Sequence, residues 1–173
     1  MPIIKDDVLT TDPWVAVGDD EPLPGVSWAI VSLERWQSEH EALVRRNAPL
    51  GIRLRSDQAP EGIADDLDHF AVVALEFPKF TDGRAYSYAR LLRERYGFRG
   101  ELRAVGNVLR DQYPFLRRCG FDVVEVADGA ELGPWLESLS AISVWYQAAS
   151  DRRRPLPLLR RDAEGQHSLS GTQ

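Results

Sequence analysis

The sequence has few of the residues on which metal and redox chemistry depend. Its 173 residues include one cysteine, one methionine and three histidines. A single cysteine excludes an intramolecular disulfide and any zinc or iron–sulfur site built only from this chain's cysteines. His40, His69 and His167 show no metal-ligand spacing and no triad pattern with Cys119. We therefore expect no metal site, and we interpret Cys119 as a small buried structural residue.

Long apolar runs and nucleotide-binding glycine patterns are also missing. No apolar run is long enough to span a bilayer, and the first residues lack the apolar core of a signal peptide. We therefore expect a cytoplasmic protein without membrane contact. No Gly-x-Gly-x-x-Gly fingerprint occurs, because neither Gly97-Phe-Arg-Gly100 nor Gly106-Asn107 matches it. Together with the single cysteine, this predicts a protein that has no cofactor of its own.

The formal net charge of −6 conceals a segregation along the chain. Residues 1–78 contain six basic and fifteen acidic side chains, whereas residues 79–118 contain ten basic and four acidic ones. A basic middle in an acidic chain indicates an anion site or a face for an acidic partner; the alternative is that its arginines are solvated on helix exteriors. The arginines lack aromatic interleaving and any nucleic-acid motif, so we do not expect nucleic-acid binding.

Strand and helix patterns alternate through most of the chain. The expected strands are 28–32, 50–55, 71–76, 101–106 and 121–126. A helical or turn segment follows each of them, most clearly at 83–96, where an apolar stripe repeats at helical spacing. Repeated β-α units predict an α/β fold with a largely parallel sheet and right-handed crossovers. The sheet is either open and doubly wound or curled like part of a barrel.

The chain is of a length that normally forms one domain. Residues 1–25 are acidic and interrupted by proline and glycine, which predicts an N-terminal arm lying on that domain. Residues 26–150 are expected to form the α/β domain itself. Residues 151–173 turn polar after an arginine–proline stretch, so we expect a flexible tail that is disordered after about residue 160.

The loop Phe77–Arg84 is the clearest candidate for a site. It leads from the carboxyl end of strand 71–76 to a helix N-terminus, where open α/β folds bind their ligands. Asp82 and Gly83 are interpreted as the helix cap and the turn. Arg84 opposes the helix dipole, so it either holds an anion or pairs with Asp82 or Glu76 and fixes the loop.

Other candidates lie near the ends of the neighbouring strands. Lys79 and Arg103 are expected to be the second and third basic groups of the same site, because loops that follow parallel strands share one edge of the sheet. The remaining candidates for ligand binding are hydroxyl and amide side chains: Tyr86, Ser87, Asn107 and Gln112. The candidates for an acid or base are carboxylates: Asp82, Asp111 and Glu125. Asp111 and Gln112 either bind a ligand or complete hydrogen bonds around Pro114.

Three stretches carry a family resemblance. They are EFPKFTDGRAYSYARLLRER from Glu76, GELRAVGNVLRDQ from Gly100 and RCGFD from Arg118. Over about residues 50–150 the chain resembles the bacterial domain of unknown function 934 family, whose members are often labelled "oxidoreductase probably involved in sulfite reduction". The resemblance implies a place in sulfur assimilation. It suggests sulfite, sulfate or a nucleotide sulfate as ligand, and sulfite reductase or another sulfur-assimilation enzyme as partner.

The residues restrict what the chain does in such a pathway. A sulfite-reducing centre needs siroheme with an iron–sulfur cluster held by cysteine thiolates, and one cysteine cannot hold such a cluster. We therefore expect an accessory or regulatory protein of assimilatory sulfite reduction, which binds a small oxyanion or a partner enzyme at a basic strand-exit edge. The alternative is an enzyme that acts by acid/base chemistry on a sulfur-containing or phosphorylated small molecule at the same edge.

Overall fold

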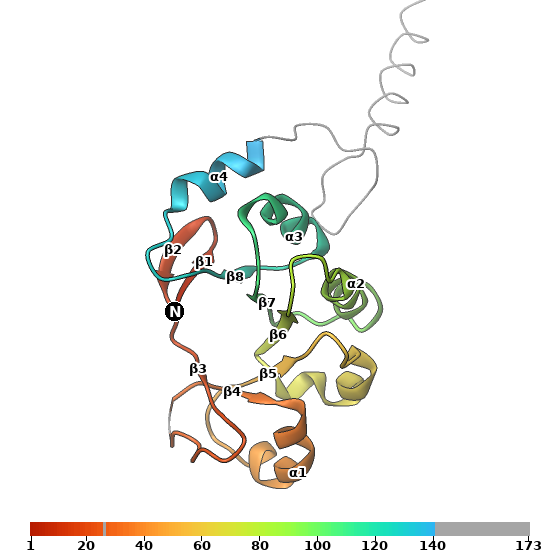
Figure 1. The fold of residues 1–173 in the computed structure, drawn as a ribbon. Coiled ribbons are helices and arrows are strands. Elements are labelled where there is room, and N and C mark those ends of the chain that lie inside the picture. Colours follow the sequence, from red (N-terminus) through yellow and green to blue (C-terminus); the bar gives the residue numbers. More distant parts are fainter. Residues whose placement is uncertain (26, 141–173) are drawn as a thin grey trace, which may run out of the picture.

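A single mixed sheet organises the structure, a computed structural model that describes residues 1–25 and 27–140. The sheet has eight strands in the order β2-β1-β8-β7-β6-β5-β4-β3 (Figure 1). Strands β3 to β8 run parallel to one another, and β1 is antiparallel to both β2 and β8. The strands are β1 (Pro2–Lys5), β2 (Val8–Thr11), β3 (Val15–Ala16), β4 (Ala29–Ser32), β5 (Leu50–Leu54), β6 (Val72–Phe77), β7 (Glu101–Gly106) and β8 (Val123–Glu125).

Helical segments alternate with the parallel strands. They are α1 (Leu33–Val44), the 3-10 helix η1 (Pro60–His69), α2 (Arg84–Arg90) with its π-helical continuation η2 (Leu91–Arg95), the 3-10 turn η3 (Arg110–Gln112), α3 (Tyr113–Cys119) and α4 (Leu132–Ser140). Ser32 caps α1, since its Oγ accepts a hydrogen bond from the backbone N–H of Arg35 at 3.0 Å. In Figure 1, α1, α2 and α3 lie on the outer side of the arc of strands. None of the helices in the described residues is long and apolar enough to cross a membrane.

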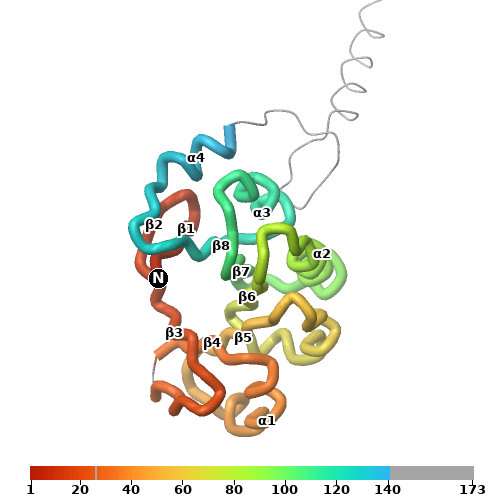
Figure 2. Tube along the Cα trace, viewed as in Figure 1, coloured from red at the N-terminus to blue at the C-terminus, as the bar shows by residue number. Residues whose placement is uncertain are grey.

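The sheet must curl, because a very short segment joins its two edges. β2 is the edge strand at one end and β3 at the other, yet only residues Asp12–Trp14 separate them in sequence. Four Cα–Cα steps span at most about 15 Å. A flat sheet of eight strands would hold these edges about 34 Å apart. The traces in Figures 1 and 2 accordingly show the strands following an arc, with the N-terminal part of the chain passing its open side.

Packing differs on the two faces of this curl. The main core lies on the convex side, between the sheet and the helices, and includes Trp36, Leu75 and Phe77. The concave side holds a smaller apolar cluster of Ile30, Val72, Ala74 and Val105, against which Trp14 packs.

Gly51 shows how little room the concave side leaves. A Cβ built on Gly51 would lie 2.9 Å from Ile30 Cγ1 and 3.2 Å from Val72 Cβ. These distances are shorter than ordinary carbon–carbon contacts. The absence of a side chain at Gly51 therefore lets β4, β5 and β6 close up on this side of the sheet.

The α/β class with a largely parallel sheet is confirmed, and the curled alternative is the one observed. Residues 1–25 do more than lie on the domain, because they contribute β1, β2 and β3 to the sheet itself. The last ten residues expected for the domain, and the expected tail at 151–173, lie outside the described residues.

Gly51→Ala tests the curl through packing. We expect it to lower the free energy of unfolding by about 1–3 kcal/mol, because the added methyl overpacks the concave face. The control is Gly62→Ala in η1, where a Cβ meets nothing within 4 Å. We expect the control to change stability by less than about 1 kcal/mol. Urea denaturation measures both, and equal effects would contradict the packing described for Gly51.

Candidate functional site

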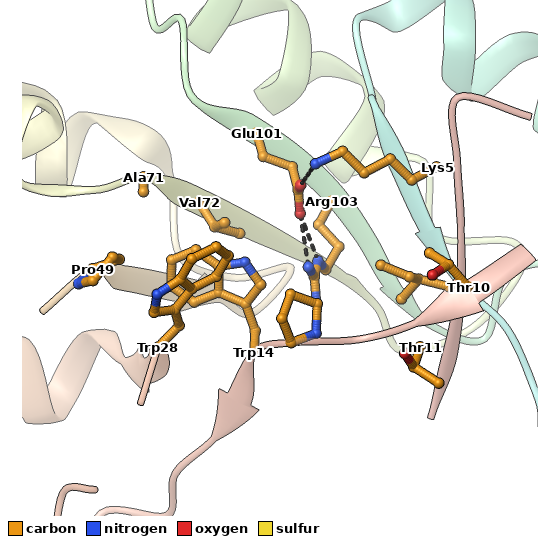
Figure 3. A pocket seen from close by; sticks show the side chains of 12 residues that line it. Lys5, Thr10, Thr11, Trp14, Trp28, Pro49, Ala71, Val72, Glu101 and Arg103 are labelled. Atoms are coloured by element: carbon orange, nitrogen blue, oxygen red, sulfur yellow. Dashed lines mark hydrogen bonds and ion pairs between the residues drawn. The ribbon is translucent and has the colours of Figure 1, made fainter. Parts of the chain in front are cut away.

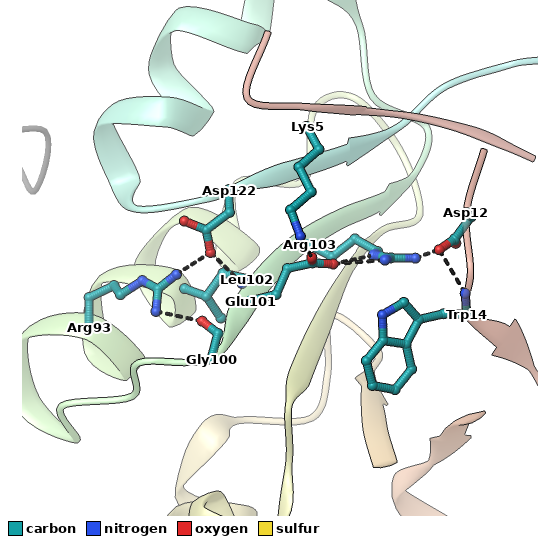
Figure 4. Close-up of polar contacts among 9 residues, drawn as sticks. All are labelled: Lys5, Asp12, Trp14, Arg93, Gly100, Glu101, Leu102, Arg103 and Asp122. Atoms are coloured by element: carbon teal, nitrogen blue, oxygen red, sulfur yellow. Dashed lines mark hydrogen bonds and ion pairs between the residues drawn. The ribbon is translucent and has the colours of Figure 1, made fainter. Parts of the chain in front are cut away.

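Arg103 holds the closing segment, Asp12–Trp14, onto the sheet. Its side chain is only 1% exposed. Its Nε and Nη2 donate to Glu101 Oε1 at 3.1 and 2.7 Å, and its Nη1 pairs with Asp12 Oδ2 (Figure 4). The other oxygen of Glu101 accepts from Lys5 Nζ at 2.8 Å, and the other oxygen of Asp12 accepts from the backbone N–H of Trp14 at 3.0 Å. This ion-pair chain joins β1, β7 and the closing segment.

The sequence analysis was therefore wrong to expect Arg103 at the carboxyl edge of the sheet, beside Lys79 and Arg84. Arg103 pairs in register with Ala74, which is three residues before the end of β6, whereas Lys79 and Arg84 follow that end. Its guanidinium is bonded to Glu101, the first residue of β7, and to Asp12. The two carboxylates hold the side chain on the concave face, toward the amino ends of the strands. The structure thus separates Arg103 from the other two basic candidates.

At the opposite, carboxyl edge, Arg84 forms an ion pair with its neighbour Asp82. Arg84 Nε donates to Asp82 Oδ1 at 3.0 Å, and Nη2 donates to Asp82 Oδ2 at 2.7 Å and to Ser56 Oγ at 2.9 Å. The backbone N–H of Arg84 also donates to Asp82 Oδ1 at 3.2 Å. These hydrogen bonds from Arg84 hold the pKa of the Asp82 carboxyl well below its usual range. The pair fixes the loop after β6 to the loop after β5.

Gln112 connects the loops that follow β6 and β7. Its Nε2 donates to the backbone carbonyl of Phe80 at 3.0 Å, and its Oε1 accepts from the backbone N–H of Leu109 at 2.9 Å. Asn107 is exposed, and its backbone N–H donates to Phe77 O at 2.7 Å. The side chain of Gln112 thus completes backbone hydrogen bonds in both loops.

The two hydroxyl candidates on α2 lie in different surroundings. Tyr86 is partly buried and packs edge-on against Phe77 and Phe115, with ring centroids 5.1 and 4.7 Å apart. Burial raises the pKa of its phenol to about 12, so the hydroxyl remains protonated at neutral pH. Ser87 is exposed and lines a shallow hollow with Arg90 on the outer surface of the helix. Tyr86 thus packs against residues of the carboxyl edge, whereas Ser87 faces the outer surface.

Large apolar side chains are exposed at this edge. Phe80 is 55% exposed, Leu109 41% and Phe115 47%. We call these three residues the carboxyl-edge patch. Lys79 lies beside Phe80 in sequence, and its side chain forms no hydrogen bond or ion pair with the described part of the chain. The carboxyl edge therefore presents apolar surface next to an unpaired cation.

The carboxylates considered for acid/base chemistry do not form a cluster. Asp82 is engaged by Arg84, and its lowered pKa keeps it ionised. Asp111 is exposed on η3, and Glu125 lies at the end of β8 opposite Ile3 of β1. Neither Asp111 nor Glu125 forms an ion pair within residues 1–25 and 27–140. Within those residues there is also no group of three or more His, Cys, Asp or Glu side chains that would hold a metal ion.

A pocket at the opposite edge was missed by the sequence reasoning. Pro49 and Ala71, which immediately precede β5 and β6, line it, so it opens at the amino ends of the strands. Its other lining residues include Lys5, Thr10, Thr11, Trp14, Trp28, Glu101 and Arg103 (Figure 3). We call it the amino-edge pocket. Its sequence signal was the pair Trp14 and Trp28, one in the N-terminal stretch and one at the start of the expected strand 28–32. Nothing in the local sequence places either of them beside β7.

Asp12→Asn tests how much the ion pair between Arg103 and the closing segment contributes to stability. We expect it to lower the free energy of unfolding by about 2–4 kcal/mol, because it leaves a buried guanidinium with one carboxylate fewer. Glu41→Gln is the control, since it breaks a pair with Arg45 whose side chains are 83% and 78% exposed. The control should cost less than about 1 kcal/mol. Comparable losses in urea denaturation would show that the buried pair contributes no more than an exposed one.

Asp82→Asn tests the pairing with Arg84 through pH. Because the pKa of Asp82 is lower in the folded chain than in the unfolded chain, ionised Asp82 stabilises the fold above about pH 4. That contribution is lost as pH falls through the folded-state pKa. Urea denaturation should show wild type more stable than Asp82→Asn at about pH 6, with a smaller difference at about pH 3. A difference that does not change with pH would contradict the pairing.

Comparison with known proteins assigns the chain to a family but to no activity. No curated protein and no solved structure matches it. The family model described as "Bacterial protein of unknown function (DUF934)" matches residues 51–157, more than half of the 173-residue chain. The match includes β6, the loop that carries Asp82 and Arg84, and β7, but not the closing segment. The chain belongs to the DUF934 family of bacterial proteins of unknown function.

Proposed function

We propose that this protein is a cytoplasmic accessory component of assimilatory sulfite reduction. In this proposal it binds a partner enzyme, sulfite reductase, through its carboxyl edge and has no redox centre of its own. The pathway is taken from the family resemblance. The binding surface is argued from the carboxyl-edge patch, and the exposure of its three large apolar side chains around Gln112 is the observation that carries the proposal.

The patch has the composition of a contact surface between proteins. Phe80, Leu109 and Phe115 come from the loop after β6, the loop after β7 and α3, so distant segments supply one apolar area. Gln112 bonds to the backbones of Phe80 and Leu109, and Tyr86 packs on Phe115. The patch is therefore ordered before any partner binds. Aromatic residues are enriched at protein interfaces, and clustered exposed apolar residues mark interaction sites.

Charges around the patch favour an acidic partner. Lys79 and Arg110 are exposed beside Phe80 and Leu109, and neither is in an ion pair with a described residue. Asp111 is the acidic neighbour of Arg110, so the cations outnumber the carboxylate. A partner surface with an apolar hollow bordered by carboxylates would complement this arrangement and be attracted to it before contact.

A protein partner is better supported at this edge than a small oxyanion. The guanidinium of Arg84 is already engaged by both oxygens of Asp82, which occupy the place that sulfite or sulfate would take. An incoming oxyanion would have to displace that carboxylate. The acid/base enzyme is also less well supported at this edge, because Asp82 remains ionised and, within the described residues, shares no hydrogen bond with a second carboxylate.

Replacement of the patch tests the proposal. Purified sulfite reductase from the same bacterium is immobilised, and binding of this protein is followed by biolayer interferometry. We expect saturable binding by the wild type. Phe80→Ser combined with Phe115→Ser should weaken it by about 30-fold or more, because clustered aromatic residues carry a large share of interface energy. Lys79→Glu should slow association and reverse its salt dependence.

The control variant is Val44→Ser at the end of α1, where the valine is 39% exposed and lies outside the carboxyl edge. It should bind as the wild type does. Circular dichroism verifies that all variants are folded. Equal binding by the double serine variant, or no binding of the wild type at micromolar concentration, would refute the proposed partner surface.

A further inference from the structure

The amino-edge pocket has the features of a second binding site, separate from the carboxyl edge. We propose that it binds a small planar aromatic anion, with the ring on Trp14 and Trp28 and the acidic group toward Lys5. Because it lies at the opposite ends of the strands from the carboxyl-edge patch, this inference is independent of the proposed partner surface.

The size and aromatic wall of the pocket suit a flat ring. Its volume is about 500 Å³, within the range of small-molecule sites. The rings of Trp14 and Trp28 lie 5.3 Å apart at an angle of 54°, and Trp28 is 43% exposed. Figure 3 shows these two indoles on one side of the pocket and Thr10 and Thr11 on the other. An aromatic ligand that stacks on the indoles would cover apolar surface that now faces solvent.

The wall is in place before a ligand enters. The backbone N–H of Trp14 donates to Asp12 Oδ1 at 3.0 Å, and the ring of Trp14 packs on the concave apolar cluster. Asp12 is in turn held by Arg103. A preorganised wall reduces the ordering cost of binding.

The carboxylate that lines the pocket, Glu101, and the neighbouring carboxylate of Asp12 are both already engaged. Glu101 accepts from Lys5 with one oxygen and from Arg103 with the other. Asp12 likewise uses one oxygen for Arg103 and the other for the backbone of Trp14. A cationic ligand would therefore meet two cations and no uncommitted carboxylate. These charges disfavour a cation and leave the pocket suited to an acceptor-rich ligand.

Donor groups, by contrast, remain available. Lys5 uses one of its three N–H groups for Glu101, and its side chain is 48% exposed. The hydrogen bond to Glu101 raises the pKa of Lys5, so the ammonium stays charged. Within the described residues, neither Trp14 nor Trp28 donates its indole N–H, and the hydroxyls of Thr10 and Thr11 add further donors. An aromatic ring that carries a carboxylate or sulfonate matches this set.

A pair of matched probes tests the inference by NMR. The anionic probe is 8-anilino-1-naphthalenesulfonate, and N-phenyl-1-naphthylamine is its uncharged counterpart. The chain has five tryptophans, so the indole signals of ¹⁵N-labelled protein are few and are assigned by single replacements. We expect the anionic probe to bind in a saturable manner and to shift the indole signals of Trp14 and Trp28. The indole signal of Trp36, which donates to Asp66 in the main core, should not move.

Variants separate the ring contact from the charge contact. Trp28→Leu should weaken the anionic probe by about tenfold. Lys5→Met should weaken it by about three- to fivefold and leave the uncharged probe unchanged. Phe115→Ser at the carboxyl edge is the control and should leave both probes unaffected. The spectra themselves show whether each variant is folded.

Two results would overturn the inference. One is that the Trp14 and Trp28 indole signals do not move when the probe is in large excess. The other is that Phe115→Ser weakens binding of the anionic probe while Trp28→Leu does not, which would place the probe on the carboxyl-edge patch.

Discussion

The ion pair between Asp12 and the buried guanidinium of Arg103 is the contact on which the arrangement of this protein depends. It fixes the closing segment to the concave face of the sheet, and that segment joins the two edge strands through three residues. A sheet of eight strands connected in this way has to curl. Inside the curl the packing is tight at Gly51, where a Cβ would meet Ile30 and Val72, two residues of the cluster on which Trp14 packs.

The curl gives the molecule two chemically different ends. At the carboxyl edge, the loops are tied to one another by Arg84 and Gln112, and apolar side chains face outward. At the amino edge, two indoles and a chain of ion pairs enclose a pocket. In β/α barrels the amino ends of the strands usually contribute stability and the carboxyl ends contribute function. Here the N-terminal segment adds a pocket to the end that ordinarily lacks one.

Local patterns in the sequence were sufficient to predict the repeating units. Alternation of apolar strands with amphipathic helices predicted the parallel part of the sheet. The pairing of Arg84 with Asp82 was one of two stated alternatives, since the residues are two apart and reach each other through a single turn. Such contacts form between residues close in sequence, so they can be predicted from the local sequence pattern.

The position of Arg103 required information that the pattern does not contain. Alternation along β7 indicates which face a side chain occupies, but not toward which end of the sheet it turns. Its partner Asp12 is 91 residues away, in a segment whose strands are short and interrupted by proline. The amino-edge pocket could not be predicted for the same reason, because it combines Trp14 and Trp28 with residues of β1, β2 and β7 that are far apart in sequence. Contacts of this kind follow from the closed curl and not from any local stretch.

The most direct measurement of that closure is paramagnetic relaxation from a nitroxide on β2 to the amides of β4. The label is placed on Thr11→Cys, with Cys119→Ser removing the only other thiol. A closed curl predicts that the amide signals of Trp28 and Ala29 are broadened together with those of β1, because Thr11 and Trp28 line the same pocket. Full intensity at Trp28 and Ala29, with broadening confined to β1 and β8, would show an open sheet and contradict the account.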